Sequence, residues 1–188
     1  MHPWHVKAVK LPFPVRLGIL SDTHASTLDT VYSSWLLEVF NGVKWVIHLG
    51  DVVYPTVFSD LESLGFSVLA VKGNNDRLLN TPTVLILESG PWRIGATHGG
   101  GGGYQEVSRR ALRQIRSVDE NPLHAVLYGH THVPFLTAGE DGIFYFNPGS
   151  LGHPRSILLP PDSLPRSSVG ILVISEDGLR FEHHFFQE

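Results

Sequence analysis

Side chains of the kinds that ligate metals recur where apolar runs of this chain end, and glycine stands beside most of them. Asp22 and His24 follow the apolar run of residues 17–20. Residues two apart on an extended chain point to the same side, so this pair can aim an oxygen and a nitrogen at one point. The other candidates stand in Gly50-Asp51, Gly73-Asn74, His98-Gly99 and Gly129-His130-Thr131-His132. Together these carboxylates, amide and imidazoles could ligate two cations.

The first half of the chain alternates strand and helix patterns. Short apolar runs at residues 15–20, 43–49 and 66–71 read as strands, and helical patterns at residues 26–40 and 55–64 separate them. Ser26 is the expected N-cap of the first helix. This alternation predicts parallel strands with helical crossovers, and ligands of such sheets collect beyond the carboxyl ends of the strands. Asp22, Asp51 and Asn74 lie at such ends, so they are predicted to converge.

The second half is richer in strands. Strand-like runs occur at residues 84–88, 92–97, 123–128, 133–138, 143–146, 169–175 and 179–186, and a helix is expected over 104–118. Asp141-Gly142 and Asp177-Gly178 are hairpin-turn dipeptides. We expect one domain over residues 1–188, with residues 1–14 as an N-terminal extension and about 152–168 as a surface loop rich in Pro and Ser. Two mixed sheets packed face to face, with helices outside, would satisfy both halves: an α/β fold built as a four-layer α-β-β-α sandwich.

Composition excludes several classes of protein. The chain has 188 residues, of which 42% are hydrophobic, enough for a core. No apolar run approaches the ~20 residues of a membrane span. The net charge of −4 gives no overall attraction to nucleic acid or anionic membrane. The absence of cysteine excludes disulfides and thiolate metal sites and fits a cytoplasmic protein. The oligomeric state stays open.

The ordered motifs Asp22-x-His24, Gly50-Asp51, Gly73-Asn74, His98-Gly99 and Gly129-His130-x-His132 resemble those of the calcineurin-like metallophosphoesterases, and most closely the small, uncapped phosphodiesterase branch. The resemblance runs from about Leu17 to Arg155. It implies a four-layer sandwich fold. It also implies that Asp22, His24 and His132 hold one metal ion, that Asn74, His98 and His130 hold a second, and that Asp51 bridges the two. Asp51, Asn74 and His98 would thereby take part directly in catalysis.

The chemistry of phosphoryl transfer suits these residue types. Two divalent ions about 3.5–4 Å apart can clamp the attacking and leaving oxygens, and a hydroxide shared by both ions can act as the nucleophile. Imidazole and carboxylate ligands favour manganese, with iron, zinc or nickel as alternatives, over calcium. The expected activity is therefore that of a metal-dependent phosphodiesterase acting on a phosphoester substrate. The alternatives are a phosphomonoesterase, such as a protein or nucleotide phosphatase of the same superfamily, and a catalytically inert metal-binding scaffold.

Two positions depart from the family pattern. Many members carry a histidine that protonates the leaving group directly after the Gly-Asn pair, whereas this chain has Asn75. Relatives often read His-Gly-His where this chain reads His98-Gly99-Gly100. Asn75, Gly99 and Gly100 are therefore candidates for substrate contact, and the donor of the leaving-group proton stays open.

The remaining histidines and the arginines of the third helix have less specific interpretations. We expect His48 to pack beside or support the ligands. Arg109, Arg113 and Arg116 share one helical stripe, read as a solvated face or, alternatively, as a face that steers phosphate. The histidines that we do not expect to be ligands are His2, His5, His124, His153, His183 and His184.

Overall fold

The computed structural model describes residues 5–155 and 164–187, which form two β-sheets and three helices. The first sheet has five strands in the order β11-β10-β2-β3-β4. Its strands are β2 (Val15–Leu20), β3 (Trp45–His48), β4 (Ser67–Ala70), β10 (Ser168–Ser175) and β11 (Gly178–Phe185). The first three are parallel, as the strand–helix alternation predicts, and β10 and β11 add an antiparallel hairpin.

The second sheet has six strands in the order β1-β5-β6-β7-β9-β8. Its strands are β1 (Val6–Lys10), β5 (Val84–Ser89), β6 (Trp92–Thr97), β7 (Ala125–Leu127), β8 (Pro134–Ala138) and β9 (Phe144–Pro148). Both parallel and antiparallel pairs occur, so this sheet is mixed as well. Both predicted hairpins are present: Asp141-Gly142 lies between β8 and β9, and Asp177-Gly178 lies where the chain turns from β10 into β11.

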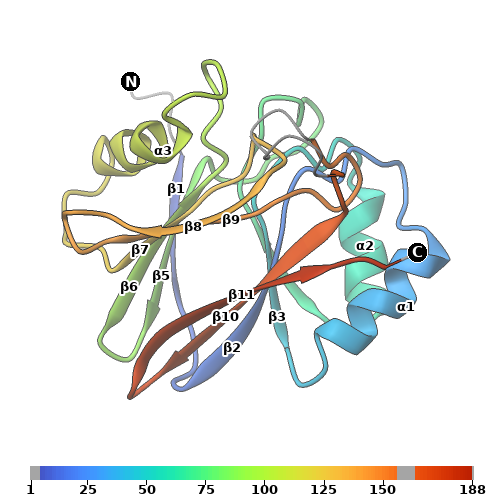
Figure 1. Ribbon diagram of the computed structural model, residues 1–188, viewed down its shortest axis with the longest axis horizontal. Coiled ribbons are helices and arrows are strands. Elements are labelled where there is room, and N and C mark those ends of the chain that lie inside the picture. Colours follow the sequence, from blue (N-terminus) through green and yellow to red (C-terminus); the bar gives the residue numbers. More distant parts are fainter. Residues whose placement is uncertain (1–4, 156–163, 188) are drawn as a thin grey trace.

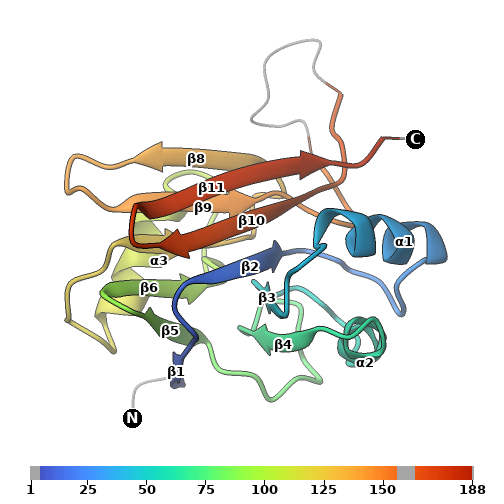
Figure 2. The ribbon, with the colours of Figure 1, turned by 90° about the horizontal axis from the view of Figure 1, so that it is seen from below.

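Helices cover the outer faces of both sheets. Helices α1 (Thr30–Val39) and α2 (Thr56–Ser63) lie against the five-stranded sheet, and α3 (Val107–Arg116) lies against the other sheet (Figures 1 and 2). Three apolar clusters separate the four layers. Leu17 and Ile47 belong to the cluster between the sheets, Leu36 to the cluster under α1 and α2, and Ile115 to the cluster under α3. The predicted α-β-β-α sandwich is confirmed.

Residues 156–163 of the predicted surface loop lie outside the described ranges, and β10 begins at the last residue of that loop. Two other local predictions differ from the structure. Residues 6–10 of the predicted extension form β1, which pairs with β5 at the edge of the six-stranded sheet. Most side chains of β1 are exposed, so the apolar signal of a core strand is absent. Helix α1 starts at Thr30 rather than Ser26, because the Asp29 carboxylate caps it by accepting from the backbone N–H of Val31 at 2.8 Å. Asp60 instead binds the segment before α1, through the backbone N–H of Leu28 at 2.8 Å.

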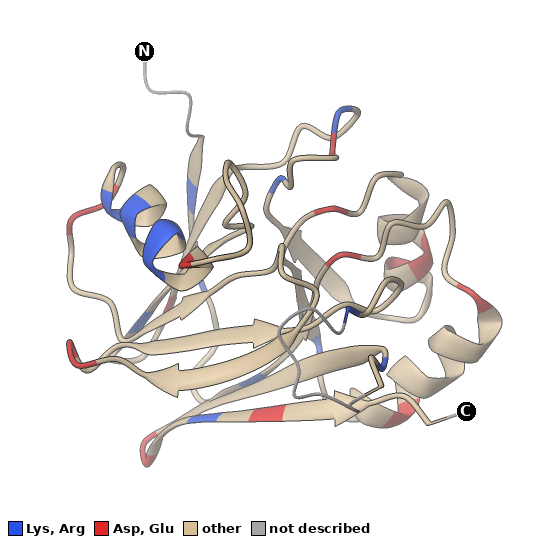
Figure 3. Cartoon of the chain, turned by 45° about the horizontal axis from the view of Figure 1, so that its top comes forward, with Lys and Arg blue, Asp and Glu red and all other residues tan. Residues whose placement is uncertain are grey.

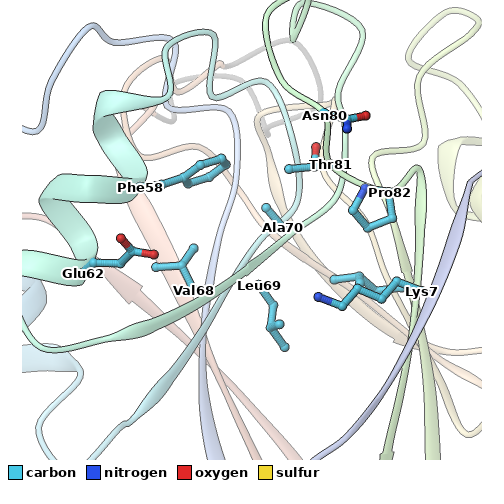
Figure 4. Close-up of a pocket in the computed structure, with 10 residues that line it drawn as sticks. Lys7, Phe58, Glu62, Val68, Leu69, Ala70, Asn80, Thr81 and Pro82 are labelled. Atoms are coloured by element: carbon cyan, nitrogen blue, oxygen red, sulfur yellow. The ribbon is translucent and has the colours of Figure 1, made fainter.

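A cavity of about 230 Å³ lies where the edge strands β4 and β1 face each other. Figure 4 shows Phe58 and Glu62 of α2 on one side of it and Lys7 of β1 on the other. None of the seven predicted metal ligands lines this cavity. The residues with metal chemistry gather elsewhere, at the ends of the strands.

Candidate metal centre

The strand ends bring five of the predicted ligands into groups that could hold a metal ion, whereas His130 belongs to neither group. Asp22 and His24 follow β2, Asp51 follows β3, and Asn74 follows β4. His98 follows β6 in the other sheet. His130 and His132 follow β7 of that sheet, so the candidate site lies where strand ends of both sheets meet.

One group of possible ligand atoms comes from Asp22, His24 and His132. Asp22 Oδ1 lies 3.2 Å from His132 Nε2 and 3.8 Å from His24 Nε2. Asp22 is fully buried, and His132 is almost so. Three atoms that can each donate a lone pair to a cation therefore surround one small volume.

A second group comes from Asp22, Asp51 and His98. Asp51 Oδ2 lies 3.5 Å from His98 Nε2 and also 3.5 Å from His24 Nε2. This one oxygen thus faces histidines of both halves of the site. Asn74 joins the second half, since its Oδ1 lies 3.1 Å from His98 Nε2. Asp22 belongs to both groups, whereas the family resemblance assigns it to a single ion.

Backbone carbonyls fix the orientation of three of the histidines. His98 Nδ1 donates to the Leu49 carbonyl oxygen at 2.8 Å, and His132 Nδ1 donates to the carbonyl of His153. His130 Nε2 donates to the Gly102 carbonyl at 3.1 Å, and its ring lies 5.2 Å from the His98 ring. A carbonyl oxygen only accepts, so each contacting nitrogen carries a proton, and the other nitrogen of each ring is the one that would ligate an ion.

Buried polar atoms at the site fit a cation. Asp22 Oδ1 and His24 Nε2 are buried and have no hydrogen-bond partner within the part of the chain that is described. Leaving such groups unpaired is costly, and a divalent ion would satisfy both at once. The donor set of carboxylate, imidazole and amide suits manganese, iron or zinc. The residues present therefore fit the metal that the sequence predicts.

The charges of the site shift its pKa values in the metal-free protein. Burial alone would lower the pKa of His98, but the neighbouring Asp51 carboxylate and the charge of Asp22 outweigh it and raise the pKa to about 9. Burial likewise opposes ionisation of Asp51, yet His98 lowers the pKa of Asp51 to about 2. The pKa of Asp22 falls well below its usual range because His132 and His24 outweigh the effect of burial. Without metal, the site therefore holds ionised carboxylates beside a protonated imidazole.

Asp76 supports the loops that carry Asp51 and Asn74. Its buried carboxylate accepts from the backbone N–H groups of Asp51 at 2.9 Å, Gly73 at 2.7 Å and Val53 at 2.7 Å. One side chain thus fixes the ends of β3 and β4 relative to each other. An acid one residue after Asn75 is visible in the sequence, but its backbone partners across the sheet are not.

Asn75, a candidate for substrate contact, is bonded to Asp51. Its backbone N–H donates to Asp51 Oδ1 at 2.8 Å, and its Nδ2 donates to Asp51 Oδ2 at 2.7 Å. Both oxygens of the predicted bridging carboxylate therefore have a partner in Asn75. Asn75 therefore positions the Asp51 carboxylate.

The other two substrate-contact candidates begin the glycine run of residues 99–103, which α3 holds in place. Arg110 Nε donates to the Gly99 carbonyl at 2.7 Å, and Gln114 Nε2 donates to the Gly100 carbonyl at 2.8 Å. A Cβ atom on Gly100 would lie 2.7 Å from Asn74 Oδ1, so only glycine allows this approach to a predicted ligand. Arg110 is half-buried and lies outside the predicted stripe of Arg109, Arg113 and Arg116, which are exposed. Figure 3 shows that basic positions gather along α3.

The histidines that we did not expect to be ligands have other partners. His124 accepts from the backbone N–H of Arg93, His183 stacks on Phe146, and His184 contacts Glu182. His5 donates its backbone N–H to Thr83, and His2 lies outside the described residues. His153 is closer to the site than expected, because its carbonyl orients His132 and its ring packs edge-on against His24. His48 contacts the Thr23 hydroxyl, between Asp22 and His24, which agrees with the predicted supporting role.

Five of the predicted ligands have left-handed backbone conformations. The φ angles are 52° at Asp22, 48° at His24, 55° at Asp51, 69° at His130 and 62° at His132. Non-glycine residues rarely adopt positive φ, and such residues cluster at functional sites where the surrounding structure holds them. Backbone bonds provide part of that support, since the N–H groups of Asp22 and His24 donate to the carbonyls of Gly50 and Asp51 at 3.0 and 3.1 Å.

Comparisons with known sequences identify a family and several relatives of this chain. Residues 15–160 match the calcineurin-like phosphoesterase superfamily domain. A probable metallophosphoesterase of Methanocaldococcus jannaschii is 36% identical over 139 residues, covering 74% of this chain and 69% of that protein. A probable metallophosphoesterase of Methanothermobacter thermautotrophicus is 32% identical over 142 residues, covering 74% and 78%. A phosphodiesterase of M. jannaschii is 28% identical over 151 residues, covering 72% and 83%.

Solved structures share the fold. A predicted phosphoesterase from Streptococcus pneumoniae superimposes with a TM-score of 0.68 at 24% identity, over 91% of this chain and 89% of that one. Vps29 from Entamoeba histolytica, solved in complex with Zn²⁺, has a TM-score of 0.68 at 20% identity, over 92% of this chain and all of its own. With the domain match and the archaeal relatives, these findings show that the chain belongs to the calcineurin-like phosphoesterase superfamily.

Proposed function

We propose that the protein is a phosphodiesterase that uses two divalent cations, most suitably Mn²⁺. The observation that carries this proposal is the position of Asp51 Oδ2, which lies 3.5 Å from a histidine nitrogen of each half of the site. One carboxylate can therefore bridge two ions and lower their mutual repulsion. In this proposal Asp22, His24 and His132 hold one ion, and Asn74, His98 and His130 hold the other.

The ions, when bound, would supply the Lewis acidity that activates water and neutralises charge on the phosphoryl oxygens. The residues around the ligands hold the ligand side chains in position. Asn75 holds the Asp51 carboxylate through two hydrogen bonds, and Asp76 holds the loops on either side of it. An amide cannot act as a general acid at neutral pH, so Asn75 does not protonate a leaving group. This favours phosphodiesters with good leaving groups over alkyl monoesters, and the name of the phosphodiesterase among the relatives supports the same reading.

The test combines elemental analysis with hydrolysis of two chromogenic esters. We expect about two Mn²⁺ ions per chain and faster turnover of bis(4-nitrophenyl) phosphate than of 4-nitrophenyl phosphate. Asp51→Asn should lose metal and activity, whereas the matched control Asp29→Asn, at the exposed start of α1, should keep both. One ion per chain under metal-replete conditions would refute the two-ion site. Failure of the wild type on every ester with every metal tried would favour the inert scaffold.

None of the helices in the described ranges has both the length and the apolar composition needed to cross a bilayer. We propose a cytoplasmic location from the lack of cysteine in the chain. Fractionation of cells that produce the tagged protein would test this location independently of activity.

A further inference from the structure

A second cavity, also about 230 Å³, opens directly beside the metal centre. His132 forms part of its wall, so it borders one half of the candidate site. The residues on the other walls include Pro134, Arg155, Leu164, Arg166 and Phe185. Two guanidinium-bearing side chains and an aromatic ring therefore line a space that begins at a predicted metal ligand.

Arg155 is tied to the segment that carries the ligand histidines. Its backbone N–H donates to the His132 carbonyl at 3.4 Å. Its guanidinium carbon lies 4.7 Å from the centre of the Tyr104 ring, a cation–π distance. Tyr104 in turn packs against His130, with ring centres 5.2 Å apart. These contacts place a positive charge next to the site and connect it to His130 and His132.

Arg166 supplies the second guanidinium of the lining. Its guanidinium carbon lies 5.5 Å from the centre of the Phe185 ring, and its Nη2 donates to the Phe186 carbonyl at 3.1 Å. No described carboxylate forms an ion pair with Arg166 or with Arg155. Each guanidinium has five N–H donors, and anions with two or more oxygens match that geometry best.

We infer that this cavity binds the non-reacting end of the substrate, and that this end carries a flat, apolar group joined to a second anionic group. The inference rests on the proposed function only in placing the reacting phosphate at the metal centre. Arg155 and Arg166 would bind the second anion, and Phe185, Pro134 and Leu164 would pack on the apolar group. A simple phosphomonoester would leave both arginines unused.

The test compares two ligands that differ by one phosphate. Binding of thymidine 3′,5′-bisphosphate and of thymidine 5′-monophosphate is measured by calorimetry with Mn²⁺ present. Because hydrogen bonds to a charged group are among the stronger ones, the bisphosphate should bind about tenfold tighter or more. Arg155→Ala and Arg166→Ala should each remove most of that advantage. Phe185→Ala should weaken both ligands by similar factors, because they share the thymine ring.

Arg180→Ala is the matched control. Arg180 lies on β11 like Phe185, but near the opposite end of the strand, and its exposed guanidinium pairs with Glu182 at 3.3 Å. This variant should keep the wild-type preference for the bisphosphate. Thermal unfolding checks that each variant is folded. If Arg155→Ala does not fold, Arg155→Lys keeps the charge but loses the planar fork, and it should retain only part of the preference.

Two results would overturn the inference: equal binding of both nucleotides by the wild type, or the same loss of preference in Arg180→Ala as in Arg155→Ala. Hydrolysis of bis(4-nitrophenyl) phosphate by the same preparations reports on the proposed function separately. A wild type that prefers the bisphosphate but hydrolyses no ester would refute the phosphodiesterase and leave the binding site standing. A wild type that hydrolyses the diester without preferring the bisphosphate would refute the binding site and leave the phosphodiesterase standing.

Discussion

Adding one methyl group at Gly100 should disturb the metal centre while leaving the fold intact. A Cβ atom there would lie 2.7 Å from Asn74 Oδ1, whereas ordinary contacts begin near 3.4 Å. The Asn74 oxygen must therefore move by about 0.7 Å, several times the ~0.2 Å tolerance of a metal–ligand distance. Losing the geometry of one ligand should weaken the affinity for one ion by about 10–100-fold, the range seen when groups around a metal site are disturbed.

Gly103→Ala is the matched control for Gly100→Ala, because a Cβ atom on Gly103 meets nothing within 4 Å. Both variants add the same methyl group to the same glycine run. Calorimetric titration with Mn²⁺ should show one weakened ion in Gly100→Ala and wild-type affinities in Gly103→Ala, with similar urea midpoints for both. Wild-type affinity for both ions in Gly100→Ala would refute the assignment of Asn74 as a ligand.

Three further predictions concern residues around the ligands. Asp76→Asn should lower the free energy of unfolding, measured by urea titration, by about 2–4 kcal/mol, because a buried backbone N–H loses its acceptor. The control Asp29→Asn, at an exposed helix cap, should change this free energy little. An equal effect of the two substitutions would contradict the role of Asp76. Mn²⁺ affinity should rise between about pH 6.5 and 9, because the raised pKa of His98 means that the metal must displace a proton from this side chain. Protonated His98 also stabilises the metal-free protein. That stabilisation is complete below about pH 6.5 and is lost as the pH rises through about 9. A flat affinity profile over that range would contradict His98 as a ligand. Asn75→Ala should weaken metal binding about tenfold by removing the Nδ2 bond to Asp51, and unchanged titrations would contradict this role.

Local sequence patterns were enough to predict the layers and the convergence of the ligands. Strand periodicity identified the ends of β2, β3 and β4, and parallel strands place those ends at one edge. The positions of Asp22, Asp51 and Asn74 follow from that rule alone. The family resemblance added the assignment of residues to individual ions, which titration of the variants above would test.

Long-range contacts account for most of what the sequence did not show. Residues 26–28 read as helix, but Asp60 of α2 binds them in another conformation, and the helix begins after Asp29. Strand β1 is stabilised by backbone pairing with β5. Because most of its side chains are exposed, its sequence does not show the apolar pattern of a core strand. Arg110 donates to the carbonyl of Gly99, eleven residues earlier in the chain, and no sequence motif indicates this contact.

The left-handed turns at the ligands have a consequence for how this protein evolves. Each non-glycine residue in that conformation costs roughly 1–2 kcal/mol, so the five turns together are a substantial part of the stability of a small domain. A descendant under selection for the fold alone would gain stability by exchanging these residues for glycine or asparagine. Asp22, His24, Asp51, His130 and His132 stand at such positions here, so glycine at any of them would relieve backbone strain but remove a predicted metal ligand.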